Sequence, residues 1–148
     1  MKFDILNKFT DKVIFTCDIE CGEDELPSIQ LGLAVKCAVE NHADLSYADL
    51  RYADLRSADL RSSDLHSADL RYADLHSADL RYADLVVILL PIWTVYVQCE
   101  YTRIGCKYFK NSEWLSFTDE EIAGMDTGAL EWWNKYKPII EAAIKSLN

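Results

Sequence analysis

The side chains with the clearest chemical potential are nine aspartates that recur at every fifth position from Asp44 to Asp84. Each is the second residue of an Ala-Asp-Leu-x-x unit. Nine such units run without a break from Ala43 to Val87, with Ser63 once in place of alanine. Carboxylates repeated at a fixed interval on a regular backbone form charged rows, and such rows attract basic partners. The units hold no group suited to catalysis, so they predict binding.

Residues with the spacing of a catalytic site are absent from the rest of the sequence. There is no glycine-rich phosphate loop, no nucleophile elbow and no histidine pair at metal-ligand spacing. Two of the three histidines, His66 and His76, are repeat residues that we expect to face water. We therefore expect a protein that is not an enzyme and that uses neither a cofactor nor a metal ion.

The five cysteines form no zinc-knuckle pattern. Cys17 and Cys21 are four residues apart in a segment that alternates like a strand, so they share a face but lie too far apart for easy chelation. The odd number of cysteines argues against a disulfide scaffold. We expect buried, reduced thiols in a cytosolic chain, with a metal site as the less favoured alternative. The cysteines are Cys17, Cys21, Cys37, Cys99 and Cys106.

A period of five residues fits neither a helix nor a strand, and it predicts a solenoid in which each unit forms one side of a coil. The units resemble the pentapeptide-repeat family. This resemblance implies a right-handed quadrilateral β-helix with four units per coil, in which leucines line the axis beside small alanines and aspartates face outward. The predicted axial residues are Leu45, Leu50, Leu55, Leu60, Leu65, Leu70, Leu75, Leu80 and Leu85.

The coil alone is too short to be stable. Nine units make two coils and a quarter, which is about 10–12 Å at the spacing of β-strands, so the flanking segments must cover its open ends. We expect one composite domain with three parts, residues 1–42, 43–87 and 88–148. The expected fold is mainly β: the solenoid, capped by an N-terminal β-hairpin plus helix and by a C-terminal segment of strands and two helices.

In the N-terminal part, alternating apolar residues predict two strands joined by a turn near residues 7–11. Pro27 at the start of a periodic apolar stretch predicts a helix over about 27–40 that leads into the first repeat. Ile29, Leu33 and Cys37, with Ala34 and Ala38, are expected on its buried face. Gly32 weakens the helix prediction, because glycine has a low helix propensity.

In the C-terminal part, strand-like runs cover 93–101 and 104–109. The apolar run 86–97 should form strands or a plug on the end of the coil, and its 12 residues are too few to cross a bilayer. A capping-box signature at Thr118 predicts a short helix ending at Gly124. A second helix should start near residue 127 and be kinked or split at Pro138.

Large apolar residues of this part are candidates for a dimer contact or for covering the end of the coil, although tryptophans most often lie in a core. We expect a two-fold homodimer through this segment, because dimers are the commonest closed assembly. The candidate contact residues are Ile88, Leu90, Trp93, Trp132 and Trp133.

The flanks resemble a group of phage- and prophage-encoded pentapeptide-repeat proteins. The resemblance rests on KFDILNKFTDKVIFTCDIEC, on LGLAVK, and on RIGCKYF followed by EW and FTDEEIAGMD. It implies a phage context and a bacterial host cytoplasm. Several members of the wider family imitate duplex DNA with rows of carboxylates and occupy the groove of a DNA-binding enzyme such as gyrase.

With four units per coil, residues twenty apart stack into columns. One column, Asp44, Asp64 and Asp84, has no arginine within its own units, whereas arginines accompany the aspartates of the other columns. Asp49 and Asp69 are further candidates for contact with a partner. The competing interpretation is that all these aspartates only hydrogen-bond the turns and keep the coil soluble.

The net charge of −10 disfavours direct binding of nucleic acid or of an anionic membrane and favours a protein with a basic surface. We therefore expect a non-catalytic inhibitor used in phage counter-defence. It would block a host nucleic-acid-binding enzyme or defence complex of the restriction, CRISPR or topoisomerase type. The alternative is a self-assembling structural or interaction module with no inhibitory activity.

Overall fold

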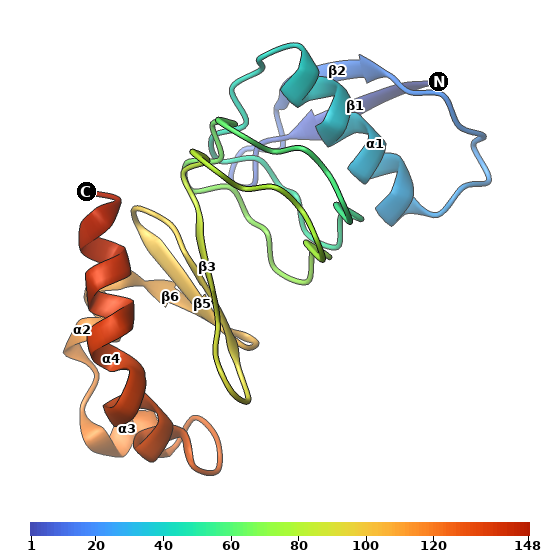
Figure 1. Cartoon of the computed structure of the whole chain (residues 1–148). Coiled ribbons are helices and arrows are strands. Elements are labelled where there is room, and N and C mark those ends of the chain that lie inside the picture. The colour runs from blue at the N-terminus through green and yellow to red at the C-terminus, as the bar shows by residue number, and fades with distance from the viewer. The chain divides into compact units, whose positions relative to one another are not determined.

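The computed structural model describes residues 1–148, and the chain divides into two compact units, Met1–Leu85 and Val86–Asn148 (Figure 1). The first unit contains a hairpin, a helix and the repeats, and the second contains a four-stranded sheet and three helices. The division falls two residues before the predicted end of the repeats at residue 87. That the three segments form one composite domain stays a prediction.

The first unit begins with an antiparallel hairpin of β1 (Lys2–Leu6) and β2 (Val13–Asp18). The carboxamide oxygen of Asn7 accepts the N–H groups of Phe9 and Thr10, at 2.9 and 3.1 Å. An asparagine that bonds the backbone two and three residues later is typical of tight turns. The predicted strands and the turn between them are therefore present.

Helix α1 (Pro27–Glu40) has the predicted bounds, with proline in its first turn. Its buried face matches the predicted one in part: Ala34 and Ala38 are fully buried, whereas Ile29, Leu33 and Cys37 are only half-buried. Gly32 and Val35, which were not predicted on this face, are also buried.

A disulfide joins Cys17 of β2 to Cys37 of α1, with Cα atoms 6.5 Å apart. This corrects the prediction of five reduced thiols, and the remaining three cysteines lie outside the disulfide and are not buried. The bond exists because α1 packs against the hairpin, so two residues twenty apart in sequence become neighbours. Nothing in their spacing signals that contact.

The repeats wind so that residues twenty apart lie side by side, as the parallel bridge between Asp49 and Asp69 shows. The Leu50 N–H donates to the main-chain oxygen of Asp69 at 2.9 Å, and the Asp69 N–H donates to that of Ala48 at 2.8 Å. The repeats thus form the predicted β-helix-like solenoid, with four units in each coil.

Each corner of the coil is a four-residue turn. In the first, the Ala48 N–H donates to the Leu45 oxygen at 3.0 Å, and the third residue, Tyr47, has a φ of 60°. A positive φ at this place is the type II geometry, which favours glycine. Tyrosine or serine adopts it here, so the ladder between coils imposes a backbone conformation that these residues rarely choose alone.

The predicted axial leucines lie in the interior of the coil. The five from Leu45 to Leu65 have no exposed surface, and Leu70 and Leu85 are 5% and 4% exposed. Leu75 and Leu80 in the last coil are half-buried. Burial is therefore most complete in the first coil, which the second coil covers on one side and the N-terminal segments cover in part on the other.

The second unit contains an antiparallel sheet whose strands lie in chain order. The strands are β3 (Val86–Leu89), β4 (Thr94–Val97), β5 (Tyr101–Ile104) and β6 (Lys107–Lys110). The predicted single strands over 93–101 and 104–109 are corrected, because each run contains a turn. The Gln98 N–H closes the first turn on the Tyr101 oxygen at 2.8 Å, and Gly105 with a φ of 56° lies in the second.

Three helices follow the sheet: α2 (Asn111–Ser116), α3 (Asp119–Ala123) and α4 (Ala129–Ser146). The predicted capping box is present, since the Thr118 N–H donates to the Glu121 carboxylate at 2.8 Å and the Glu121 N–H donates to the Thr118 hydroxyl at 3.3 Å. Helix α2 was not predicted. Helix α4 is not split at Pro138 but continues through it. None of the helices is long and apolar enough to cross a bilayer.

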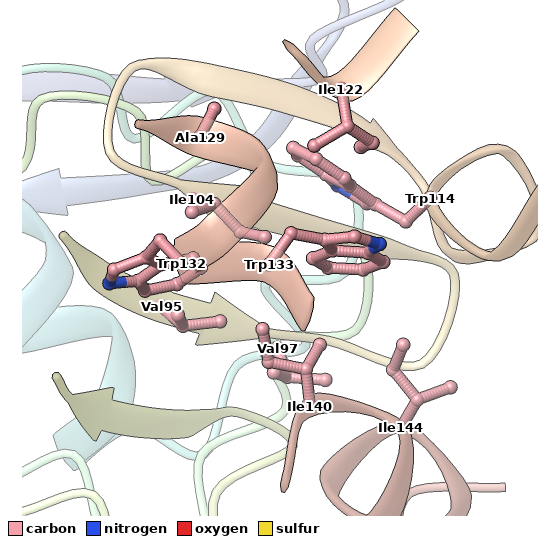
Figure 2. Packing of buried hydrophobic residues seen from close by; sticks show 10 residues of the cluster. All are labelled: Val95, Val97, Ile104, Trp114, Ile122, Ala129, Trp132, Trp133, Ile140 and Ile144. Carbon is pink, nitrogen blue, oxygen red and sulfur yellow. The ribbon is translucent and has the colours of Figure 1, made fainter. Parts of the chain in front are cut away.

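Aromatic and aliphatic side chains from sheet and helices form the core of the second unit (Figure 2). The rings of Trp114 and Trp133 lie 5.5 Å apart, and the Trp114 indole N–H donates to the Thr102 oxygen at 2.8 Å. The five residues considered for dimer or capping contacts either belong to this cluster or pack against it. Trp132 and Trp133 are 6% and 4% exposed, and the partly buried ones packed against the core are Ile88, Leu90 and Trp93.

Candidate functional site

The repeat aspartates share one local contact with the backbone. In the first eight units the carboxylate accepts the N–H of the residue two positions later. The distances range from 2.8 Å, for Asp44 with Ser46, to 3.3 Å, for Asp64 with His66. These side chains therefore support the corner turns, as the competing interpretation of the sequence proposed.

Each of the five repeat arginines also donates hydrogen bonds to the carboxylate of the aspartate two residues before it. The Arg51 Nε donates to the Asp49 carboxylate at 2.7 Å and lies 3.8 Å from that of Asp69 in the next coil. We call this contact, in which one guanidinium group donates hydrogen bonds to one carboxylate, the arginine fork. It holds the pKa of Asp54 and Asp59 at about 2, through hydrogen bonds from Arg56 and Arg61. The full set of arginines is Arg51, Arg56, Arg61, Arg71 and Arg81.

Two of the predicted partner-binding residues do not present a free carboxylate. Asp69 is buried, with 3% of its surface exposed, and Arg71 holds it. Asp49 is half-buried and its fork to Arg51 lowers the pKa of its carboxyl group. The expectation that Asp49 and Asp69 face a partner is corrected on this ground, because a paired carboxylate offers little charge to a second cation.

The remaining candidates form one exposed row on a single side of the coil, the acidic column of Asp44, Asp64 and Asp84. None of the three has an arginine within its own unit. The Ser46 hydroxyl donates to the Asp64 carboxylate at 2.9 Å, and hydrogen bonds from Ser46 lower the pKa of Asp44, as does, to a smaller extent, the electrostatic effect of nearby His66. The column therefore consists of exposed carboxylates without the arginine contact that the aspartates on the other sides of the coil have.

The repeats match the family described as Pentapeptide repeats over residues 41–75 and 58–86, with eight copies of the unit. Residues 41–86 are a pentapeptide-repeat segment. Pentapeptide-repeat proteins are often protein-interaction modules. No curated protein and no solved structure matches the chain. The pentapeptide-repeat match covers the coil, so the hairpin, α1 and the second unit are not assigned to a family by it.

An exposed aromatic pair on a neighbouring side of the pentapeptide-repeat coil escaped the sequence analysis. Tyr52 and Tyr72 stack with ring centroids 5.0 Å apart and planes 11° apart, and they are 60% and 57% exposed. They are twenty residues apart, the same spacing that builds the aspartate columns. A comparison of the last residues of units that lie twenty positions apart would have predicted this pair.

Proposed function

We propose that this protein is a non-catalytic inhibitor that binds a basic protein surface through the acidic column. The target would be a host nucleic-acid-binding enzyme or defence complex of the restriction, CRISPR or topoisomerase type, met in the bacterial cytoplasm during phage counter-defence. The flanking segments, which resemble phage and prophage proteins, support that setting. The column would occupy the surface on which the target binds the phosphate backbone of its nucleic acid.

The observation that supports this proposal is the contrast between the sides of the coil. On the other sides each aspartate lies within 4 Å of an arginine, so those sides approach neutrality. The acidic column has three exposed carboxylates and no arginine within its own units. Such a row acts over about 8 Å at physiological ionic strength, so it speeds the approach of a basic partner more than it strengthens the final contact.

Replacing Asp44, Asp64 and Asp84 together with asparagine is expected to abolish inhibition while the fold remains. Asparagine has the same size and its carboxamide oxygen can still accept the turn N–H, so melting should change little. Inhibition by the parent protein is measured in DNA cleavage and supercoiling assays with restriction, CRISPR and type II topoisomerase enzymes. It should weaken steeply as salt rises, because exposed charges are screened.

The matched control is the double replacement of Asp54 and Asp74 with asparagine, which removes two carboxylates from a side with an arginine. That variant should inhibit nearly as well as the parent. If it loses as much inhibition as the triple variant, or if the triple variant inhibits normally, the acidic column is only a solvated surface. Failure of the parent against every enzyme class would contradict inhibition itself.

Self-assembly remains a second candidate because of an apolar surface on the second unit. Leu89 at the end of β3 is 82% exposed, and Ile92 in the turn before β4 is 79% exposed with a φ of 76°. Large apolar residues this exposed are frequent at sites of protein association. In sequence they are adjacent to Ile88, Leu90 and Trp93, three of the residues that the sequence suggested for a dimer.

The prediction for this candidate is a two-fold dimer at micromolar concentration that becomes a monomer when Leu89 and Ile92 are both replaced by serine. The masses are measured by multi-angle light scattering across a dilution series. Replacing Leu26 and Phe9, which are exposed on the first unit, by serine is the control and should leave the dimer intact. A parent mass of one chain at all concentrations excludes this assembly.

A further inference from the structure

The N-terminal edge of the first coil is covered on two of its sides by the chain itself. On one side the Asp49 N–H donates to the Leu6 oxygen at 2.8 Å, where β1 ends. On the next side the Asp54 N–H donates to the Ser28 oxygen at 2.9 Å, in the first turn of α1. On both of these sides, a segment from outside the repeats accepts a hydrogen bond from a main-chain N–H at the edge of the coil.

The following side, residues 58–62, has no such cover. One coil later, the Asp79 N–H donates to the Ala58 oxygen and the Asp79 oxygen accepts the Leu60 N–H, both at 2.9 Å. Asp59 holds the same place in the first coil, so its N–H and oxygen point toward the N-terminal end. Neither group has a partner there, and we call the main chain of residues 58–62 the open edge.

A groove of about 790 Å³ lies along the open edge. The C-terminal half of α1 forms one wall through Lys36, Val39 and Glu40, and the coil forms the floor, where small side chains such as Ser62 leave room. A span of five residues is roughly 16 Å long in an extended chain. The groove therefore has the place and the length for one short β-strand.

The charges around the groove favour a cationic occupant. Arg61 is already forked to Asp59, and Arg81 to Asp79. This leaves Glu40, Asp44 and Asp64 against Lys36. The last turn of α1 contains no basic residue, so the negative end of its dipole is also uncompensated. A neutral or acidic peptide would leave these groups without a counter-charge.

We propose that the open edge binds a short extended peptide that carries lysine or arginine, which adds to the coil as a β-strand. The peptide accepts the Asp59 N–H and donates to the Asp59 oxygen, as strands do when they extend a sheet. Its cationic side chains reach Glu40, Asp44 and Asp64. The site shares Asp44 and Asp64 with the acidic column, but its main-chain contacts at Asp59 do not depend on the proposed function, since a peptide can occupy the edge whether or not the protein inhibits an enzyme.

The experiment uses the full chain and a fluorescent peptide, acetyl-Val-Lys-Val-Lys-Val-Lys-amide, in an anisotropy titration. N-methylation of the amides that face the edge should weaken binding about tenfold, because it removes main-chain hydrogen bonds. Exchange of the lysines for glutamates should weaken it at least as much. In ¹⁵N–¹H spectra the amide of Asp59 should shift with the parent peptide, and its hydrogen exchange should slow.

A protein variant gives an independent readout. Asp59→Pro removes the N–H from the edge and should also weaken binding about tenfold, whereas Asp59→Asn removes the fork to Arg61, keeps the N–H and should bind nearly as the parent. Equal binding of the parent and N-methylated peptides overturns the proposal, because charge alone would then account for it. No binding of the parent peptide, or binding without a shift of the Asp59 amide, overturns it as well.

Discussion

Replacing Leu65 with aspartate is expected to unfold the first unit at room temperature. Leu65 has no exposed surface and lies on the axis of the coil. A carboxylate there has no cation to pair with, and burying such a group costs about 4 kcal/mol or more. That loss is comparable to the whole stability of a small domain, about 5–15 kcal/mol. Far-UV circular dichroism during heating measures the result.

The control for this prediction is Leu65→Met, which keeps the volume and should cost less than about 1.5 kcal/mol. A cooperative melt of Leu65→Asp near the temperature of the parent would contradict a leucine-lined axis. All four tryptophans lie in the second unit, so their fluorescence shows separately whether that unit unfolds too. Joint unfolding would support one composite domain, and native fluorescence would show two independent units.

The coil could be predicted in detail because its signal is local and repeated. A five-residue period fixes which residue faces the axis, and stacking of residues twenty apart then follows from four units per coil. The bridge between Asp49 and Asp69 and the burial of Leu50 are direct consequences. The arginine-free column was predictable for the same reason, since every unit repeats the same geometry.

The flanks could be predicted less well because their turns carry weaker signals. Gln98, Cys99 and Glu100 reverse the chain between β4 and β5 without glycine or proline, so the apolar run around them reads as one strand. The disulfide and the open edge depend on where α1 lies, which is a matter of tertiary packing. No local pattern in the sequence expresses that position.

The pairing of the aspartates shows a different limit of sequence reasoning. Asp69 and Asp64 belong to the same Asp-Leu pattern, yet Asp69 is 3% exposed and Asp64 is exposed. The residue two positions later does not explain the difference, because Asp59 is forked to Arg61 and its side chain is still 60% exposed. The bidentate fork to Arg71 was not anticipated, because columns of charge do not reveal which atoms meet.

Gly32→Ala is expected to destabilise the first unit although alanine is the better helix former. Helix propensity alone would stabilise α1 by about 1 kcal/mol. A Cβ at this position would overlap the main-chain oxygen of Asp54, so the helix and the coil would have to move apart. Overpacking of this kind typically costs about 1–3 kcal/mol and occasionally more. Because both partners here are backbone, we expect the upper end of that range.

The net loss should be about 2 kcal/mol, which corresponds to roughly 10 °C in Tm for a unit of this size. Gly124→Ala is the matched control, because a Cβ at Gly124 meets its nearest atoms at 3.4 and 3.6 Å and the φ is −76°. That variant should melt at or above the temperature of the parent. A Gly32→Ala protein that melts no lower than the parent would show that α1 does not lie against the coil at Asp54. The contact of Ser28 with Asp54, and the cover that α1 gives to that side of the coil edge, would then be wrong. A melting temperature that falls for Gly32→Ala and not for Gly124→Ala supports that contact and that cover.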